Sequence, residues 1–208
     1  MCLEVARVHH GLVVGQPNVG KTLLCLRLAQ ASSNLVPLII HESPSGGIVE
    51  RRLHLKDAIS TLVSAKPHTT VGIQTLALGF GVKVSERFLL DDTTGLTPDI
   101  EDQMVRSGMA RTLERIVCAT VILHVVDASA GLARNQLNRT DELIRSVSMA
   151  TKVPYFLIFN KLDLAGAPEK AVSYRKRHRE TKIFSISALK DIGIEDLLDN
   201  LRRASVVK

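Results

Sequence analysis

One eight-residue segment of the chain has glycines, a lysine and a threonine at the spacing of a phosphate-binding loop. From Gly15 to Thr22 it fits the pattern GxxxxGK[ST]. The glycines allow close approach of the backbone, so that its N–H groups and the following helix N-terminus point at phosphate oxygens. In such a loop the lysine reaches the β- and γ-phosphates and the threonine hydroxyl ligates Mg²⁺. The expected nucleotide contacts are Gly15, Gln16, Pro17, Asn18, Val19, Gly20, Lys21, Thr22 and Leu23.

The alternative, a chance glycine-rich turn, is disfavoured by the position of this segment between a predicted strand and a predicted helix.

A second motif, DTTG, follows the predicted strand ERFLLD. Its first residue, Asp92, is placed to hold Mg²⁺ through water, and the Gly95 N–H to sense the γ-phosphate. The neighbouring Asp91 is unusual before such a motif, and we assign the role to Asp92 because of its spacing to Gly95.

A third motif, NKLD, ends the apolar run VPYFLIF. The Asp163 carboxylate would accept hydrogen bonds from the guanine N1–H and exocyclic amine, and adenine would leave this buried acceptor unmatched. Asn160 would connect this loop to the phosphate-binding loop, and the Lys161 stem would lie over the base plane. The alternative reading is a polar turn that closes a strand.

Two further segments support these motifs. After the last predicted strand, the backbone N–H groups of Ser187, Ala188 and Leu189 would meet the guanine O6. In the segment KPHTT, we favour Thr70 as the residue that senses Mg²⁺ and the γ-phosphate, with Thr69 as the second choice.

With five motifs in order, the chain resembles the Era/Obg/TrmE-like branch of translation-factor-class small GTPases from Leu12 to Leu201. The strings that carry the resemblance are GQPNVGKT, PHTT, DTTGL, NKLD and SALKDIGIEDLL. The resemblance implies a P-loop protein that binds GTP and GDP and hydrolyses GTP to GDP and phosphate with Mg²⁺ as a molecular switch. The implied catalytic residues are Lys21, Thr70, Gly95 and Asn18, and the implied Mg²⁺ ligands are Thr22, Thr70 and Asp92.

The residue after DTTG departs from the Ras-like pattern. Ras-like proteins have there a glutamine that orients the attacking water, and this chain has Leu96. Intrinsic hydrolysis should then be slow or depend on another group, for which Asp99, Glu101 and Asp102 are candidates. The alternative function is a nucleotide-dependent binding switch or scaffold with negligible hydrolysis until a partner completes the site.

Asn18 leads to a second hypothesis that rests on the resemblance. Members of this branch with asparagine at this position often use K⁺ beside the phosphates, which implies K⁺ stimulation and activation by a homodimer across the nucleotide face. The alternative is that Asn18 only forms hydrogen bonds within the loop.

Alternating apolar runs and helical stretches predict one α/β domain over residues 1–208. The resemblance implies that this domain is a three-layer P-loop NTPase G domain. We expect a mostly parallel six- or seven-stranded sheet with helices on both faces. Residues 32–67 are expected to be an insertion in the first switch region, with a helix from Ile48 to Ser64. The other expected strands are Gly11–Gly15, Ile73–Phe80, Val82–Asp91 (joined to the preceding strand at Gly81), Thr120–Asp127, Val153–Asn160 and Lys182–Ile186, and the other expected helices are Gly20–Ala31, Asp99–Val117, Asn135–Ala150, Glu169–Glu180 and Ile194–Arg203.

Composition limits the class of protein. Three separated cysteines without a CxxC pair and no secretory signal favour a cytoplasmic location, and no apolar run is long enough for a membrane span. The net charge of +6 favours anionic partners such as nucleotide, RNA or an acidic membrane surface. The basic run Arg175–Arg179 is read first as a solvated face, with contact to ribosomal RNA as the alternative. His124 is expected in the core or at a sheet edge, and a protein effector stays open.

Overall fold

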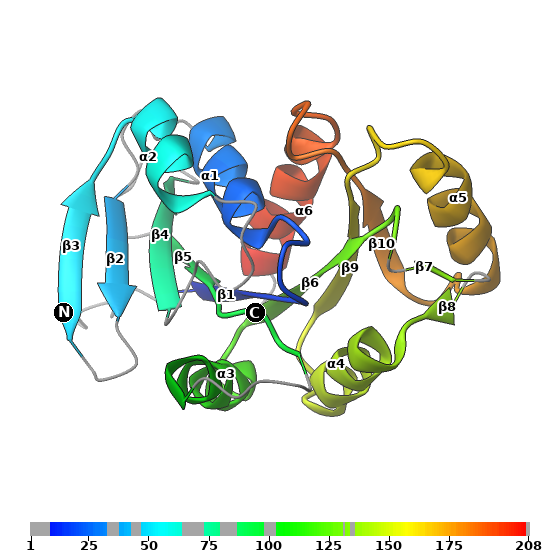
Figure 1. Ribbon diagram of the computed structural model, residues 1–208, viewed down its shortest axis with the longest axis horizontal. Coiled ribbons are helices and arrows are strands. Elements are labelled where there is room, and N and C mark those ends of the chain that lie inside the picture. The colour runs from blue at the N-terminus through cyan, green and yellow to red at the C-terminus, as the bar shows by residue number, and fades with distance from the viewer. Residues whose placement is uncertain are drawn as a thin grey trace, which may run out of the picture.

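The computed structural model of the chain (Figure 1) describes residues 9–32, 38–42, 47–63, 73–79, 87–97, 103–130, 132–133 and 136–206. Its centre is one twisted sheet with helices on both faces, the α/β arrangement that the sequence predicted. The predicted turn at Gly81 and the predicted helix start at Asp99 lie outside the described residues.

The sheet contains eight strands among the described residues, in the order β10-β9-β6-β1-β5-β4-β2-β3. The run from β10 to β5 is parallel, whereas β5, β4, β2 and β3 pair antiparallel. The carboxyl ends of the five parallel strands therefore meet at one edge of the sheet, where ligands bind in open α/β folds. The strands are β1 (His9–Val14), β2 (Leu38–Glu42), β3 (Ile48–Arg52), β4 (Ile73–Gly79), β5 (Arg87–Asp92), β6 (Val121–Asp127), β9 (Tyr155–Asn160) and β10 (Lys182–Ser185).

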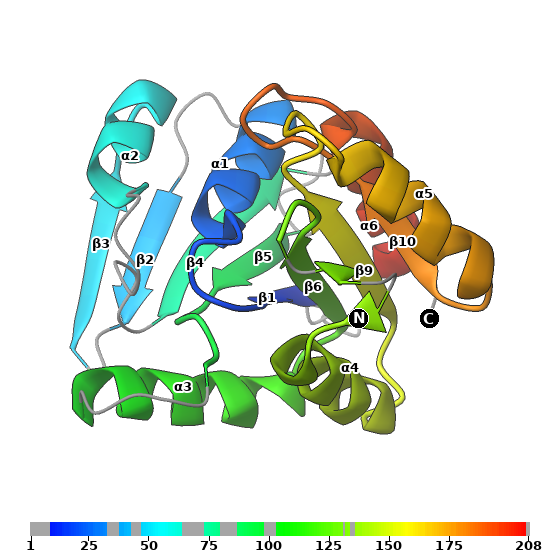
Figure 2. The same ribbon diagram turned by 45° about the vertical axis from the view of Figure 1, so that its right-hand side comes forward.

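Two layers of helices cover the sheet. Helices α1 (Lys21–Ala31) and α6 (Ile194–Val206) pack on one face, with α2 (Leu55–Leu62) beside α1. Helices α3 (Gln103–Ile116), α4 (Arg139–Ala150) and α5 (Ala167–Arg177) pack on the other (Figure 2). Strands β1, β6 and β9, between these layers, are almost wholly buried, because a sheet covered on both faces needs apolar residues at nearly every position.

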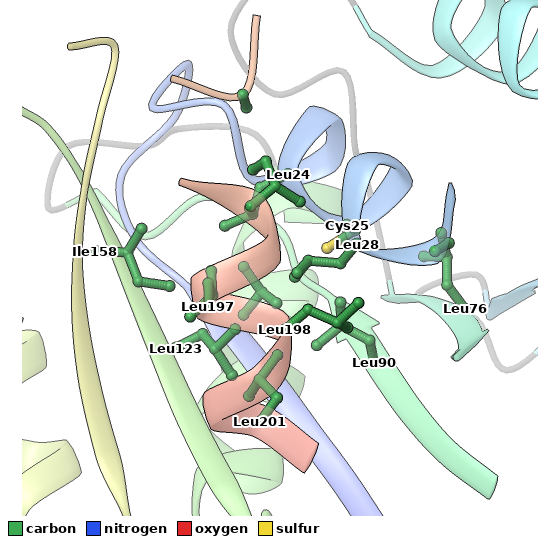
Figure 3. Close-up of a cluster of buried hydrophobic side chains, with 14 of the residues drawn as sticks. Leu24, Cys25, Leu28, Leu76, Leu90, Leu123, Ile158, Leu197, Leu198 and Leu201 are labelled. Carbon is green, nitrogen blue, oxygen red and sulfur yellow. The ribbon is translucent and has the colours of Figure 1, made fainter. Parts of the chain in front are cut away.

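The largest buried cluster lies between α1, α6 and the sheet. Figure 3 shows Leu24 and Leu28 of α1 beside Leu198 of α6, above Leu90 and Leu123 of the sheet. All five side chains are fully buried. This packing fixes the start of α1, and with it the end of the loop that precedes the helix.

The sheet is one or two strands larger than predicted, because the segment before β4 contributes β2 and β3. The predicted helix from Ile48 to Ser64 is therefore wrong over its first part. Residues Ile48–Arg52 form a strand that pairs antiparallel with β2, and the helix covers only Leu55–Leu62. The pairing supplies backbone hydrogen bonds from a partner strand, which a local pattern does not reveal.

Two predicted helix boundaries also change. Helix α4 begins at Arg139 rather than near Asn135, because Gln136–Leu137 (β8) pairs with Leu132–Ala133 (β7) in a separate two-stranded ladder. The Asn138 side chain then caps the helix by accepting a hydrogen bond from the Asp141 N–H. Helix α5 ends at Arg177 rather than Glu180.

In the part of the chain that the structure describes, no helix has both the length and the apolar character needed to cross a bilayer. The expectation of no membrane-spanning segment agrees with this finding.

The packing of α6 gives a prediction of stability. Leu198→Ala should lower the free energy of unfolding by about 2–5 kcal/mol, because it removes buried methyl groups and leaves a cavity beneath α1. Urea denaturation followed by circular dichroism measures the change. The matched control is Leu143→Ala on α4, where the side chain is 65% exposed and the loss should stay within about 0.5 kcal/mol. Equal losses in the two variants would contradict this account of the core.

Candidate nucleotide-binding site

The predicted phosphate-binding loop connects the end of β1 to the start of α1 and requires glycine at two positions. Gly15 has φ 148°, and a Cβ atom there would lie 2.3 Å from the carbonyl oxygen of Val125. Gly20 has φ 92°, and a Cβ atom would lie 2.4 Å from the Asn160 side-chain nitrogen. The loop thus passes directly against β6 and the end of β9, where a residue with a side chain does not fit.

Lys21 begins α1 and turns back beneath this loop. Its Nζ donates hydrogen bonds to the carbonyl oxygens of Gly15 at 3.2 Å and Gln16 at 2.8 Å. Burial lowers the pKa of Lys21 to about 8, although the negative charge of Asp92 opposes the shift. A phosphate group beside the ammonium would counter this cost, because it supplies the missing negative charge.

Thr22, which is partly buried, and Asp92, which is fully buried, form a pair between α1 and the end of β5. The Thr22 hydroxyl donates to Asp92 Oδ2 at 2.6 Å, and Asp92 Oδ1 is buried without a hydrogen-bond partner among the described residues. Burial raises the pKa of Asp92 to about 6, against the opposing effects of Lys21 and Thr22.

This pair fits the Mg²⁺ site that the sequence predicts. Both groups are hard oxygen ligands, and a carboxylate oxygen without a partner is suited to a cation or to its bound water. No cluster of three or more His, Cys, Asp or Glu side chains that could hold a metal occurs in the described part of the chain. A site with two protein oxygens suits Mg²⁺, which keeps several waters and takes phosphate oxygens as ligands.

The segment Thr93–Leu96 packs onto the phosphate-binding loop. The Leu96 N–H donates to the Gly15 carbonyl at 3.0 Å, and the Thr93 hydroxyl donates to the Val13 carbonyl at 2.7 Å. A Cβ atom on Gly95 would lie 2.7 Å from the backbone nitrogen of Pro17. This contact requires glycine at position 95.

The side chains next to this glycine face the protein interior. Thr94 is fully buried, and a Cβ atom at position 108 would lie 2.5 Å from its hydroxyl, so that Thr94 fits because residue 108 is glycine. Leu96 is 5% exposed and belongs to the apolar cluster that includes Leu12 and Ile116. Leu96 therefore has neither the chemistry nor the position to orient a water molecule.

Asp91 points to the opposite face from Asp92, since successive strand residues alternate. Its carboxylate accepts a hydrogen bond from Thr75 at 2.6 Å and lies 3.5 Å from Arg115 and 3.7 Å from His10. The geometry thus favours Asp92 over Asp91 at the metal site, as the motif spacing did.

Asn160 connects the predicted base-binding loop to two other segments. Its Nδ2 donates to the Val19 carbonyl at 2.8 Å, and its Oδ1 accepts from the Ala188 N–H at 3.0 Å. A single buried side chain thus joins the end of β9, the phosphate-binding loop and the loop after β10. The connection expected from the sequence is present.

Lys161 and Asp163 occupy the same loop. Lys161 has φ 65°, and its Nζ lies 2.7 Å from Asp127 Oδ2. Burial of Asp127 opposes its ionisation, yet the hydrogen bonds from Lys161 and Ser129 outweigh this effect and lower the pKa. Asp163 is exposed, and the Ser187 hydroxyl donates to it, which orients the carboxylate.

The loop after β10 has hydrogen bonds of its own. The Ser187 N–H donates to the Ile192 carbonyl in an isolated bridge, and the Ala188 N–H donates to Asn160. The expected contact of this loop with guanine O6 stays a prediction. Of the three predicted donors, the Leu189 N–H alone has no hydrogen-bond partner among the described residues.

Other predicted site residues have different outcomes. Asn18 is exposed and has φ 60°, a left-handed conformation that asparagine tolerates better than most residues, which is a reason for asparagine independent of any cation. The Leu23 side chain is partly buried and packs against the main core, and its predicted nucleotide contact stays a prediction. Thr70 and Thr69 lie outside the described residues, as do Asp99, Glu101 and Asp102.

The sequence interpretation missed two acidic residues near the site. Asp127 pairs with Lys161, and its signal was an acid at the end of the buried strand LHVVD. Asp141 on α4 accepts a hydrogen bond from the Gln16 side chain at 2.7 Å, a contact across 125 positions that no local pattern signals.

Comparisons with known proteins give consistent results. The model of a family described as 50S ribosome-binding GTPase matches residues 52–161, a range that begins after the phosphate-binding loop. The tRNA modification GTPase MnmE of Thermotoga sp. (strain RQ2) is 26% identical over 92% of this chain and 34% of its own length. GTPase Der of Chlorobium phaeobacteroides (strain BS1) is 29% identical over 91% of this chain and 35% of its own.

Among solved structures, Era in complex with MgGDPNP and a segment of 16S ribosomal RNA superposes with TM-score 0.69 and 22% identity. The match covers 95% of this chain and 57% of that one, and at this identity it establishes the fold. The chain spans about a third of the length of the curated relatives above.

The raised pKa of Asp92 predicts how stability depends on pH without nucleotide and with EDTA. The native state holds this proton up to about pH 6 and the unfolded state only to about 3.8, so the native state binds more protons between these values. The free energy of unfolding should therefore decrease from pH 4 to pH 6, by about 2 kcal/mol from Asp92 alone.

Asp92→Asn should lack this decrease, and urea denaturation at pH 4, 5, 6 and 7 measures it. The control is Asp57→Asn at an exposed position of α2, which should keep the pH profile of the unmodified chain. Identical profiles for Asp92→Asn and the unmodified chain would show that Asp92 does not hold a raised pKa.

Proposed function

We propose that this chain, which belongs to the family of 50S ribosome-binding GTPases, binds GTP with Mg²⁺ and hydrolyses it to GDP and phosphate as a molecular switch. Membership of this family confirms the resemblance to Era/Obg/TrmE-like GTPases that the motifs indicated. The structural match to Era confirms the fold.

The observation that carries the proposal is the position of Asn160. Its side chain connects the base-binding loop to the phosphate-binding loop, which supports a single site that includes both Asp163 and Lys21. One bound nucleotide would then contact the phosphate-binding loop with its phosphates and Asp163 with its guanine base. A P-loop enzyme that used ATP would have no use for the Asp163 carboxylate oriented by Ser187.

The chain's own residues contribute position and charge. Lys21 and the loop N–H groups would bind the β- and γ-phosphates, and Thr22 with Asp92 would hold Mg²⁺. The bound ion would neutralise charge that develops on the phosphates. Gly95, on the segment attached to Gly15, is proposed to respond to the γ-phosphate together with Thr70, so that both segments relax after hydrolysis.

A second candidate function is a nucleotide-dependent binding switch whose hydrolysis is negligible without a partner. The burial of Leu96 favours it, because no group at this position can orient water. The two functions differ in one measurable quantity, the GTP turnover of the isolated chain.

We treat the partners and the organisation of the chain as part of the proposal. We propose one G domain over residues 1–208, with an insertion at about 32–67 in the first switch region. Ribosomal RNA or a protein effector is the proposed macromolecular partner, in line with the RNA bound to Era and with the net charge of +6. The exposed free thiol of Cys118 supports a cytoplasmic, reducing location.

Asp163→Asn tests the base assignment. An amide replaces one acceptor with a donor, so the preference should move from GTP to xanthosine triphosphate, with GTP affinity reduced at least about 100-fold. Competition against a fluorescent GDP analogue measures both affinities, and Asp199→Asn on the outer face of α6 is the control. Full GTP selectivity in Asp163→Asn would remove Asp163 from the site.

GTP turnover with Mg²⁺ in KCl against matched NaCl tests the enzyme and the proposed K⁺ site together. A higher rate in KCl that also rises with protein concentration is expected if Asn18 ligates K⁺ and a homodimer activates the chain. Asn18→Gly keeps the left-handed backbone at φ 60° but removes the amide, and it should abolish the difference between the salts.

Equal rates in the two salts would remove K⁺ from the proposal. A rate near zero under every condition would favour the switch that depends on a partner. Lys21→Ala provides the baseline, because it removes the charge nearest to the phosphates.

A further inference from the structure

A relay of four hydrogen-bonded polar side chains, two of them buried and two partly buried, runs from the sheet to the phosphate-binding loop. The Tyr155 hydroxyl lies 2.7 Å from His124 Nδ1, and His124 Nε2 lies 3.1 Å from Asp141 Oδ1. Asp141 Oδ2 accepts from the Gln16 side chain at 2.7 Å. The four residues come from β9, β6, α4 and the loop after β1, and nothing in the proposed reaction uses the first three.

The middle of this relay is withdrawn from solvent. His124 is fully buried and Asp141 is 1% exposed, and His124 lies on the sheet face that also carries the apolar residues Leu12, Val14 and Ile122. A buried carboxylate is costly unless it is fully hydrogen-bonded, and the Asp141 carboxylate has three partners, His124, Gln16 and Asn138 Nδ2, the last at 2.9 Å. Apolar residues would fill the same space at lower cost, so the arrangement calls for an explanation.

The directions of the hydrogen bonds follow from chemistry. Burial raises the pKa of Tyr155, so its hydroxyl keeps the proton and donates to His124 Nδ1. The other ring nitrogen then carries the imidazole hydrogen and donates to Asp141, which can only accept. Each residue from Tyr155 to His124 therefore donates a hydrogen bond to the next. The Asp141 carboxylate accepts from His124 at one oxygen and from the Gln16 amide at the other.

Gln16 connects Asp141 to Lys21, the residue expected to contact the phosphates. Its carbonyl accepts the hydrogen bond from Lys21 Nζ at 2.8 Å, while its side chain is held by Asp141. The negative charge of Asp141 also opposes the loss of the Lys21 proton. One residue of α4 thus acts on both the backbone of the loop and the charge of its lysine.

We propose that Tyr155, His124 and Asp141 are positioning residues that hold the phosphate-binding loop through Gln16 and set how long the nucleotide stays bound. The identity of that nucleotide rests on the proposed function. The relay also attaches the N-terminal turn of α4 to the loop, so that displacement of this turn weakens nucleotide binding.

The experiment compares Gln16→Met with the unmodified chain. Methionine keeps the length of the side chain but cannot donate to Asp141. The dissociation rate of a fluorescent GDP analogue should rise about tenfold, as expected for loss of a hydrogen bond to a buried charge. Gln103→Met is the matched control at an exposed position on α3 and should leave the rate unchanged.

A double-variant cycle identifies the route. Asp141→Asn should also speed dissociation, and the combination with Gln16→Met should be no faster than the more severe single variant, because both break one connection. Effects that multiply would overturn the relay. A loss confined to the free energy of unfolding, with unchanged dissociation, would also overturn it and leave these residues a structural role only.

Amide hydrogen exchange of residues 15–22 without nucleotide separates the relay from the proposed function. Exchange should be faster in Gln16→Met than in Gln103→Met, whatever ligand the chain takes. If the unmodified chain binds no guanine nucleotide, the proposed function fails and this comparison still decides the relay. Equal exchange in the two variants would overturn it.

Discussion

Two opposite charges buried beneath one loop are the constraint on which this structure depends. Lys21 is 7% exposed and Asp92 is fully buried, and burial moves the pKa of each toward its neutral form, to about 8 and about 6. Lys21 is satisfied by loop carbonyls and Asp92 by Thr22, with Asp92 Oδ1 left without a partner among the described residues. Such a site is least stable when it has no ligand, since a phosphate and a cation would supply what each charge lacks.

The sheet makes this arrangement possible. Strands β1 and β5 are parallel neighbours, so the loop after Val14 and the carboxylate of Asp92 emerge at the same edge. Alternation along β5 sends Asp92 toward α1 and Asp91 toward the opposite face. The antiparallel strands β2 and β3 lie beyond β4 at one side of the sheet, so neither is a neighbour of β1 or β5.

What could be predicted from the sequence was local. The pattern from Gly15 to Thr22 encodes both a conformation and a chemistry within eight residues, and the assignment of Asp92 needed only its distance from Gly95. Ile48–Arg52 was misread because a strand at a sheet edge depends on its partner rather than on its own pattern. The hydrogen bond from the Ser187 N–H to the Ile192 carbonyl could not be predicted for a similar reason, since the motif does not show this bridge. Asp141 was missed because its contacts with Gln16 and His124 join segments far apart in the chain.

The phosphate-binding loop is held from three sides, and each tether comes from a different part of the fold. Asn160 holds the carbonyl of Val19, Asp141 holds the side chain of Gln16, and the Leu96 N–H holds the carbonyl of Gly15. The first tether leads to the base-binding loop, the second to α4 and the third to the segment after β5. A change in any of these elements must therefore alter the loop, and by reciprocity a ligand that orders the loop must favour one arrangement of all three. The proposed nucleotide affinity and the proposed recognition of the bound state by a partner would therefore both depend on the same three hydrogen bonds.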